Sequence, residues 1–162
     1  MKLCIHRGTR QIGGIAAEIS TASTRILIDM GDELSLDPNF VSAPLNIPGV
    51  TDGNGHCDAV LFTHYHGDHT GQMLRIRPEI PIYAGALAKD IMRLSAERGG
   101  QKNEALCKRI ETMQAFSPGK PFLIGDIQIT PFCIDHSACD SYMFLIEADG
   151  KRVLYTGDFR LH

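Results

Sequence analysis

Several features that mark common classes of protein are absent from this chain of 162 residues. It has no run of about 18 apolar residues, so we expect no transmembrane helix and no membrane partner. Its N-terminal residues lack the apolar stretch of a signal peptide, and we therefore expect a cytoplasmic protein. The five cysteines are scattered without a Cys-x-x-Cys pair, which argues against a disulfide framework or a zinc ribbon. We expect most of them to be small buried residues.

An excess of positive charge is also absent. Sixteen Lys and Arg residues are balanced by nineteen Asp and Glu residues, which gives a formal net charge of −3. Proteins that hold a phosphate backbone usually carry a basic patch, whereas acidic residues are interspersed among the basic ones between positions 89 and 109. We interpret that region as a solvated helical surface. The length and a hydrophobic content of 43% are typical of one globular domain, expected over residues 1–162.

The most informative segment, residues 63–69, is Thr-His-Tyr-His-Gly-Asp-His and follows an apolar, β-prone run. It contains four residues of the types that bind zinc and similar divalent ions: His64, His66, Asp68 and His69. Alternate side chains of an extended segment project to the same side, so the first two histidines can bind one ion. A turn at Gly67 would direct Asp68 and His69 toward a second ion, the arrangement used in dinuclear hydrolysis. A solvated polar turn is the alternative, and the density of ligands favours the metal site.

This motif resembles the His-x-His-x-Asp-His signature of the metallo-β-lactamase-fold hydrolases. Three further residues resemble landmarks of that family in the same order: Asp29 at the end of a strand-like run, His136 in Ile-Asp-His-Ser, and Asp158 in Thr-Gly-Asp-Phe-Arg. The resemblance implies an αββα sandwich, a fold of the α/β (α+β) class. It also implies that Asp29 supports the metal loop from outside the ligand set.

The resemblance further implies a centre of two zinc ions (Zn2+). The first ion would be bound by His64, His66 and His136, and the second by Asp68 and His69, with Asp158 bridging both. A hydroxide shared by the ions would be the nucleophile, and Asp68 and Asp158 are the residues we expect to act in catalysis. Ser137 and Thr156 are candidates for hydrogen bonds to the ligands.

Local similarity narrows the family. Segments 136–141 and 155–160 are similar to those of the β-CASP nucleases, especially ribonuclease J-like proteins, as is the glycine-rich segment 8–14. This branch implies RNA as the substrate. In full-length members a further histidine of the second metal lies beyond the motif that Asp158 resembles, after an inserted domain. The sequence ends four residues after Asp158, so we expect it to cover only the N-terminal part of the catalytic domain, truncated before the insertion.

These observations predict a dinuclear zinc phosphodiesterase or ribonuclease. A hydrolase of the same fold that acts on a small ester, thioester or lactone remains an alternative, because a fold does not determine a substrate. A third possibility is a catalytically incomplete metal-binding fragment, whose exposed sheet edges would favour a homo-oligomer.

Hydrophobic patterning places the motifs on elements. Strands are predicted over 2–7, 15–20, 24–29, 58–63 and 81–83, with hairpins turning at 125–126 and 149–150. Helices are predicted over 70–77, 85–98 and 102–113, the second ended by Gly99 and Gly100. The Pro- and Gly-rich segment 30–57 is predicted to be a long loop beside the substrate entrance. Because a strand precedes each candidate ligand, we expect the ligands to gather at one edge of a sheet.

Overall fold

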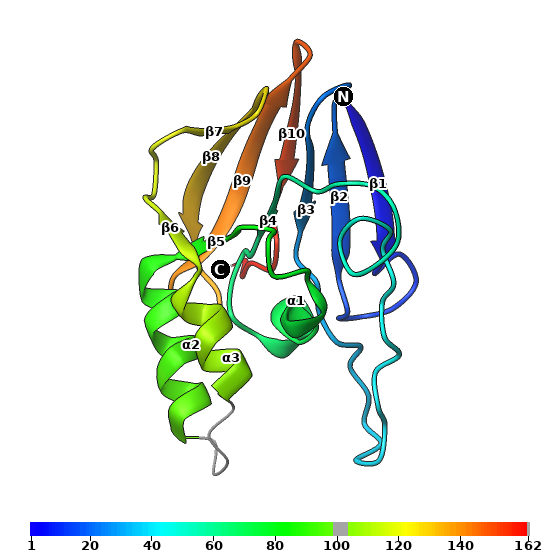
Figure 1. The fold of residues 1–162 in the computed structure, drawn as a ribbon. Helices are drawn as coiled ribbons and strands as arrows, with labels where there is room; N and C mark the ends of the chain where they lie inside the picture. The colour runs from blue at the N-terminus through cyan, green and yellow to red at the C-terminus, as the bar shows by residue number, and fades with distance from the viewer. Residues whose placement is uncertain (99–103, 162) are drawn as a thin grey trace.

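Two β-sheets that pack face to face form the centre of the molecule (Figure 1). The computed structural model describes residues 1–98 and 104–161. The first sheet contains, in spatial order, β1 (Lys2–Arg7), β2 (Ala16–Ser20), β3 (Arg25–Ile28), β4 (Ala59–Leu61), β5 (Ile82–Gly85) and β6 (Gln114–Phe116). The second contains β10 (Lys151–Tyr155), β9 (Ser141–Ala148), β8 (Ile127–Ile134) and β7 (Phe122–Ile124). Strands β3 to β6 are parallel, and the remaining pairs are antiparallel.

Strand β3, inside the first sheet, is apolar on both faces. Ile26 and Ile28 join the cluster between the sheets, where they meet residues such as Phe144 of β9. Leu27, between them in sequence, points to the opposite face and joins a second cluster with Phe62. Alternate side chains of a strand project to opposite faces, so an uninterrupted apolar run requires cover on both sides. The prediction of a doubly covered strand over 24–29 is confirmed.

The outer face of the first sheet is covered by helices and by the long loop. Helices α2 (Ala86–Arg98) and α3 (Glu104–Glu111) lie side by side (Figure 1). Ile110 of α3 and loop residues Ile47 and Val50 belong to the same apolar cluster as Leu27. Among the residues that the structure describes, no helix covers the outer face of the second sheet, where Phe132 and Leu154 are exposed. The described chain therefore supplies both sheets and one helical layer of the expected sandwich.

The helix predicted over 70–77 has the wrong bounds. Helix α1 spans Gly67–Thr70, and a short 3₁₀ helix, η1, spans Met73–Arg75. The chain leaves the helix because the backbone N–H of Gln72 donates to the carbonyl of Met30, outside the helix, at 3.0 Å. The helix therefore begins inside the ligand motif, and Asp68 and His69 lie on it.

Strand β6 and the burial of the cysteines differ from what the sequence predicted. The short strand β6 was not predicted, and the proposed helix end at residues 99–100 lies outside the described residues. All five cysteines are free, as expected, yet only Cys57 is buried, while Cys133 and Cys139 are exposed. The expectation that most cysteines are buried is therefore wrong. Within the described ranges, no helix has the length and apolar character needed to cross a bilayer.

Candidate metal centre

Four chain segments converge at one end of the two sheets. Asp29 directly follows β3, and the motif 63–69 follows β4 and runs into α1. His136 comes shortly after β8, and Asp158 comes shortly after β10 of the second sheet. The strands thus deliver side chains that are far apart in sequence to one place.

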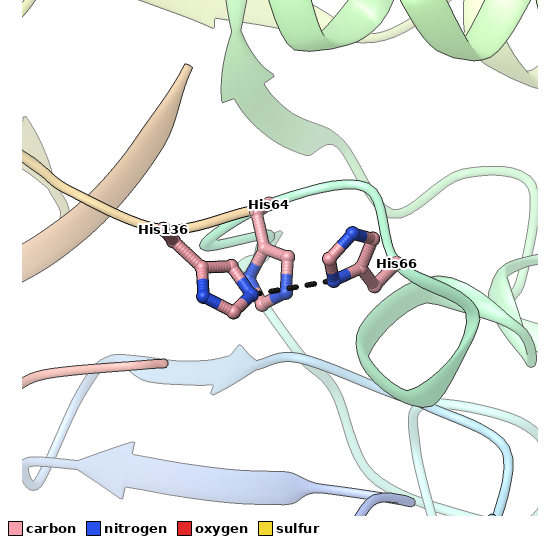
Figure 2. A group of neighbouring side chains, drawn as sticks. All are labelled: His64, His66 and His136. Carbon is pink, nitrogen blue, oxygen red and sulfur yellow. Dashed lines mark hydrogen bonds between the residues drawn. The ribbon is translucent and has the colours of Figure 1, made fainter. Parts of the chain in front are cut away.

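Three histidines form the first group of candidate ligands. One ring nitrogen each of His64, His66 and His136 lies within 4.8 Å of the other two. Figure 2 shows the three rings turned toward one another, with His66 Nδ1 and His136 Nε2 3.3 Å apart. Two nitrogens bound to one tetrahedral zinc at the usual bond length lie about 3.4 Å apart. The spacing therefore suits a cation shared by these two rings.

A second group of candidate ligands shares His64 with the first. It consists of His64, His69 and Asp158, again with ligand atoms within 4.8 Å. His69 Nε2 is 3.5 Å from Asp158 Oδ2 and 3.7 Å from Asp68 Oδ2. Asp158 Oδ2 is also 3.9 Å from His136 Nε2, so this carboxylate lies between the two groups. The structure thus brings together all six residues predicted as ligands, and their role as ligands stays a prediction.

The buried carboxylate of Asp29 forms hydrogen bonds to residues of this cluster. Its side chain is fully buried and accepts hydrogen bonds from the Thr63 backbone N–H at 2.9 Å and from Tyr155 Oη at 3.1 Å. Its Oδ2 lies 2.9 Å from His69 Nδ1. The Asp29 backbone adopts φ +59°, a left-handed conformation that is uncommon outside glycine and turns the carboxylate back toward the motif. Asp29 therefore holds the motif without lying in either group of candidate ligands.

Two ring nitrogens in the cluster have no hydrogen-bond partner. Among the described residues, the buried side-chain nitrogens and oxygens without one are His64 Nε2, His69 Nε2 and Arg109 Nε. Leaving a polar atom buried and unpaired costs free energy, and a bound cation would supply the missing partner for both histidines. Their Nδ1 atoms are meanwhile engaged by Thr63 and Asp29. An imidazole with one nitrogen anchored and the other free is the usual arrangement of a metal ligand, so the residues fit a divalent metal.

The electrostatics of the cluster also suit a cation. Burial lowers the pKa of His64 to about 2, and the neighbouring rings of His69, His66 and His136 act in the same direction. Burial also lowers the pKa of His69, but the hydrogen bond and charge of Asp29 outweigh it and the net shift is upward. His64 is therefore neutral at physiological pH, which is the form of imidazole that binds a metal.

Comparison with known proteins identifies the family. Residues 24–162 match the family model described as "Beta-lactamase superfamily domain". The chain belongs to this family. Among curated proteins, ribonuclease J 1 of Streptococcus pyogenes serotype M3 is similar to this chain, with 27% identity over 158 residues, which is 94% of this chain and 27% of that protein. The chain thus spans about a quarter of the length of that relative.

Solved structures show the metallo-β-lactamase fold. A protein of unknown function from Enterococcus faecalis V583 superposes with a TM-score of 0.81 at 21% identity, covering 99% of this chain and 44% of that one. The metallo-β-lactamase fold protein YhfI from Bacillus subtilis superposes with a TM-score of 0.62 at 18% identity, covering 95% and 61%. The superfamily fold implies divalent metal binding, which agrees with the histidine and aspartate cluster.

Two residues that contact the cluster were missed at the level of sequence. Thr63 directly precedes His64, and its hydroxyl contacts Asp29 and the rings of His64 and His69. Its place beside the motif was the one sequence feature that could have indicated this role. Tyr155 reaches Asp29 from the other sheet, which no local pattern reveals. Of the two residues expected to support the ligands, Thr156 donates instead to the Gly157 carbonyl. In the described part of the chain, the side chain of Ser137 makes no hydrogen bond to the candidate ligands.

Proposed function

We propose that this chain carries the metal centre of a dinuclear zinc hydrolase that cleaves phosphodiester bonds in RNA. The observation that carries the proposal is the pair of buried, unpartnered Nε2 atoms of His64 and His69, two residues whose ligand atoms lie within 4.8 Å of each other and of the Asp158 carboxylate. Neutral nitrogen ligands combined with carboxylates form the donor set of zinc hydrolases.

The proposed ligands divide into two sets. The first zinc would be held by His64, His66 and His136, and the second by Asp68 and His69, with Asp158 contributing to both. His64 also lies within reach of the second set. Two bound cations would lower the pKa of a water molecule toward about 7 and neutralise charge on a substrate phosphate.

The chain's own residues would orient the substrate and handle the proton. Asp158 is 40% exposed whereas the His69 side chain is fully buried, so substrate would approach from the Asp158 side. Asp68 is 14% exposed and has an oxygen 3.7 Å from His69 Nε2, a position from which it can accept a proton from water. The exposed Arg160, two residues beyond Asp158 in the sequence, would offer a cation to a substrate phosphate.

RNA is favoured as the substrate by similarity to ribonuclease J 1, which extends over nearly all of this chain. The net charge of −3 points the other way and keeps a small ester or thioester as the second candidate. A protein that binds RNA through its phosphate groups loses affinity steeply as the salt concentration rises, whereas the affinity for a neutral thioester does not depend on salt in this way. Cleavage of single-stranded RNA and of an acyl thioester, each measured at two salt concentrations, therefore separates the candidates.

The first test is metal content per chain, measured together with mass in solution. Two zinc ions per chain are expected for the wild type, and the mass reports whether the site is shared within a homo-oligomer. His66→Ala should lose zinc from the first position. His56→Ala is the matched control, because the His56 side chain is exposed and lies beside Asp58, at 3.6 Å, outside both groups of candidate ligands. Full zinc occupancy in the His66 variant would remove that residue from the ligand set.

A further inference from the structure

The hydroxyl group of Thr63 lies at the centre of the buried network. Thr63 is 1% exposed, and its Oγ1 is 3.1 Å and 3.0 Å from the two carboxylate oxygens of Asp29. The same atom is 3.1 Å from His64 Nδ1 and 3.3 Å from His69 Nδ1. A hydroxyl has a single proton to donate and two lone pairs that accept, so these contacts cannot all have the same direction.

The chemistry of the partners decides the direction of each bond. An ionised carboxylate only accepts, so Thr63 donates its proton to Asp29. His69 Nδ1 lies closer to Asp29 Oδ2, at 2.9 Å, than to the threonine, and therefore donates to the carboxylate. His64 Nδ1 then faces a hydroxyl oxygen whose proton is already committed. The remaining bond requires a proton on His64 Nδ1, which leaves the Nε2 lone pair free.

We propose that Thr63 is a positioning residue that transmits the orienting effect of Asp29 to His64. Asp29 thus fixes His69 directly and His64 through the threonine hydroxyl. A single buried carboxylate thereby selects the tautomer of one histidine in each proposed ligand set. The selected tautomer is a property of the metal-free chain, while its consequence for zinc rests on the proposed function.

The arrangement predicts which zinc position depends on the hydroxyl. Losing a residue that orients a metal-binding histidine commonly weakens metal binding about 10- to 100-fold. Thr63→Val keeps the branched shape but removes the donor and the acceptor, so zinc bound through His64 should weaken by about that factor. His69 keeps its direct bond to Asp29 and should be affected less. Thr63→Ser retains the hydroxyl and should restore binding.

Tautomers can be read directly by long-range proton–nitrogen NMR correlation of the histidine rings in metal-free protein. We expect His64 protonated on Nδ1 in the wild type and in Thr63→Ser, and a shift toward Nε2 protonation in Thr63→Val. His69 should stay protonated on Nδ1 in all three proteins. An unchanged His64 tautomer in Thr63→Val would overturn the proposal.

The test does not depend on the folding of one variant. The wild-type spectrum alone refutes the proposal if His64 carries its proton on Nε2, whether or not a variant folds. Thr63→Ala removes the hydroxyl without placing a second methyl group beside Asp29, and it replaces the valine variant if that variant is unfolded. Zinc titration then distinguishes the positioning role of Thr63 from the proposed zinc-binding function. The expected tautomers without any zinc binding would contradict the proposed function and leave the positioning role intact.

Discussion

Because Gly31 has no side chain, the segment that contains Asp68 and His69 can pack closely against the backbone after β3. The variant Gly31→Ala tests whether this close packing matters for stability. A Cβ atom at Gly31 would lie 1.6 Å from the carbonyl oxygen of Asp68. Real Cβ atoms essentially never approach another heavy atom more closely than 3.0 Å. The obstacle is backbone, so a side chain cannot rotate away to make room. The two segments would have to separate by more than an ångström.

The cost follows from the hydrogen bonds that this separation would break. Backbone bonds join Ile15 to Asp68 at 3.1 Å, Met30 to His69 at 2.7 Å, and Asp32 to Gly67 at 2.9 Å. Each is worth about 1 kcal/mol net, so we expect Gly31→Ala to lower the free energy of unfolding by about 3 kcal/mol. Because Asp68 and His69 lie on the displaced segment, zinc affinity should fall as well.

Gly67→Ala provides a matched control on the same loop. No atom lies within 4 Å of a Cβ built at Gly67, and alanine is favoured over glycine in a helix by up to about 1 kcal/mol. Urea denaturation followed by circular dichroism, with zinc titration of each variant, measures both effects. If Gly31→Ala were within about 0.5 kcal/mol of the wild type, the size of an ordinary surface substitution, the argument from close approach would be refuted.

Three further changes are predicted. Asp140→Ala removes the carboxylate that accepts from the Ala88 backbone N–H at 2.8 Å in the first turn of α2, and should cost about 1 kcal/mol by urea denaturation. Phe144→Ala opens a cavity between the sheets and should cost about 3–5 kcal/mol in the same assay, whereas a cost near zero would contradict the assigned core. Burial raises the pKa of Glu18, but hydrogen bonds and charge from Arg25 and His6 outweigh it, so the net shift from 4.5 is downward. A lowered pKa stabilises the fold above pH 4.5 and that contribution is lost as pH falls, so Glu18→Gln should flatten the acid side of the stability–pH curve.

Local patterns in the sequence were enough to predict most of the sheet strands and the candidate ligands of segment 63–69, whereas His136 and Asp158 were predicted from the family resemblance. The apolar run before His64 gave the strand, and the spacing of the motif gave a set of side chains that the structure places together. The hairpins at 125–126 and 149–150 followed from turn residues between apolar runs and are confirmed. These features depend on neighbours in sequence, which is why they were predictable.

The remaining features depend on contacts between distant segments. The early start of α1 is linked to bonds with Met30 and Asp32, residues on another segment. The three-residue strand β6 is too short to show a periodicity, and pairs with β5 only because the helices bring it back. Tyr155 contacts Asp29 across 126 residues of chain, and no pattern near either residue indicates the pairing.

That pairing has a consequence for the order of events during folding. The contacts that fix Asp29 join residues 34, 40 and 126 positions apart, and the last of them crosses from one sheet to the other. Closing such long loops costs entropy that is repaid only when the sheets pack together. The centre is therefore completed late, and a cation that requires its final geometry would stabilise the finished fold without nucleating it.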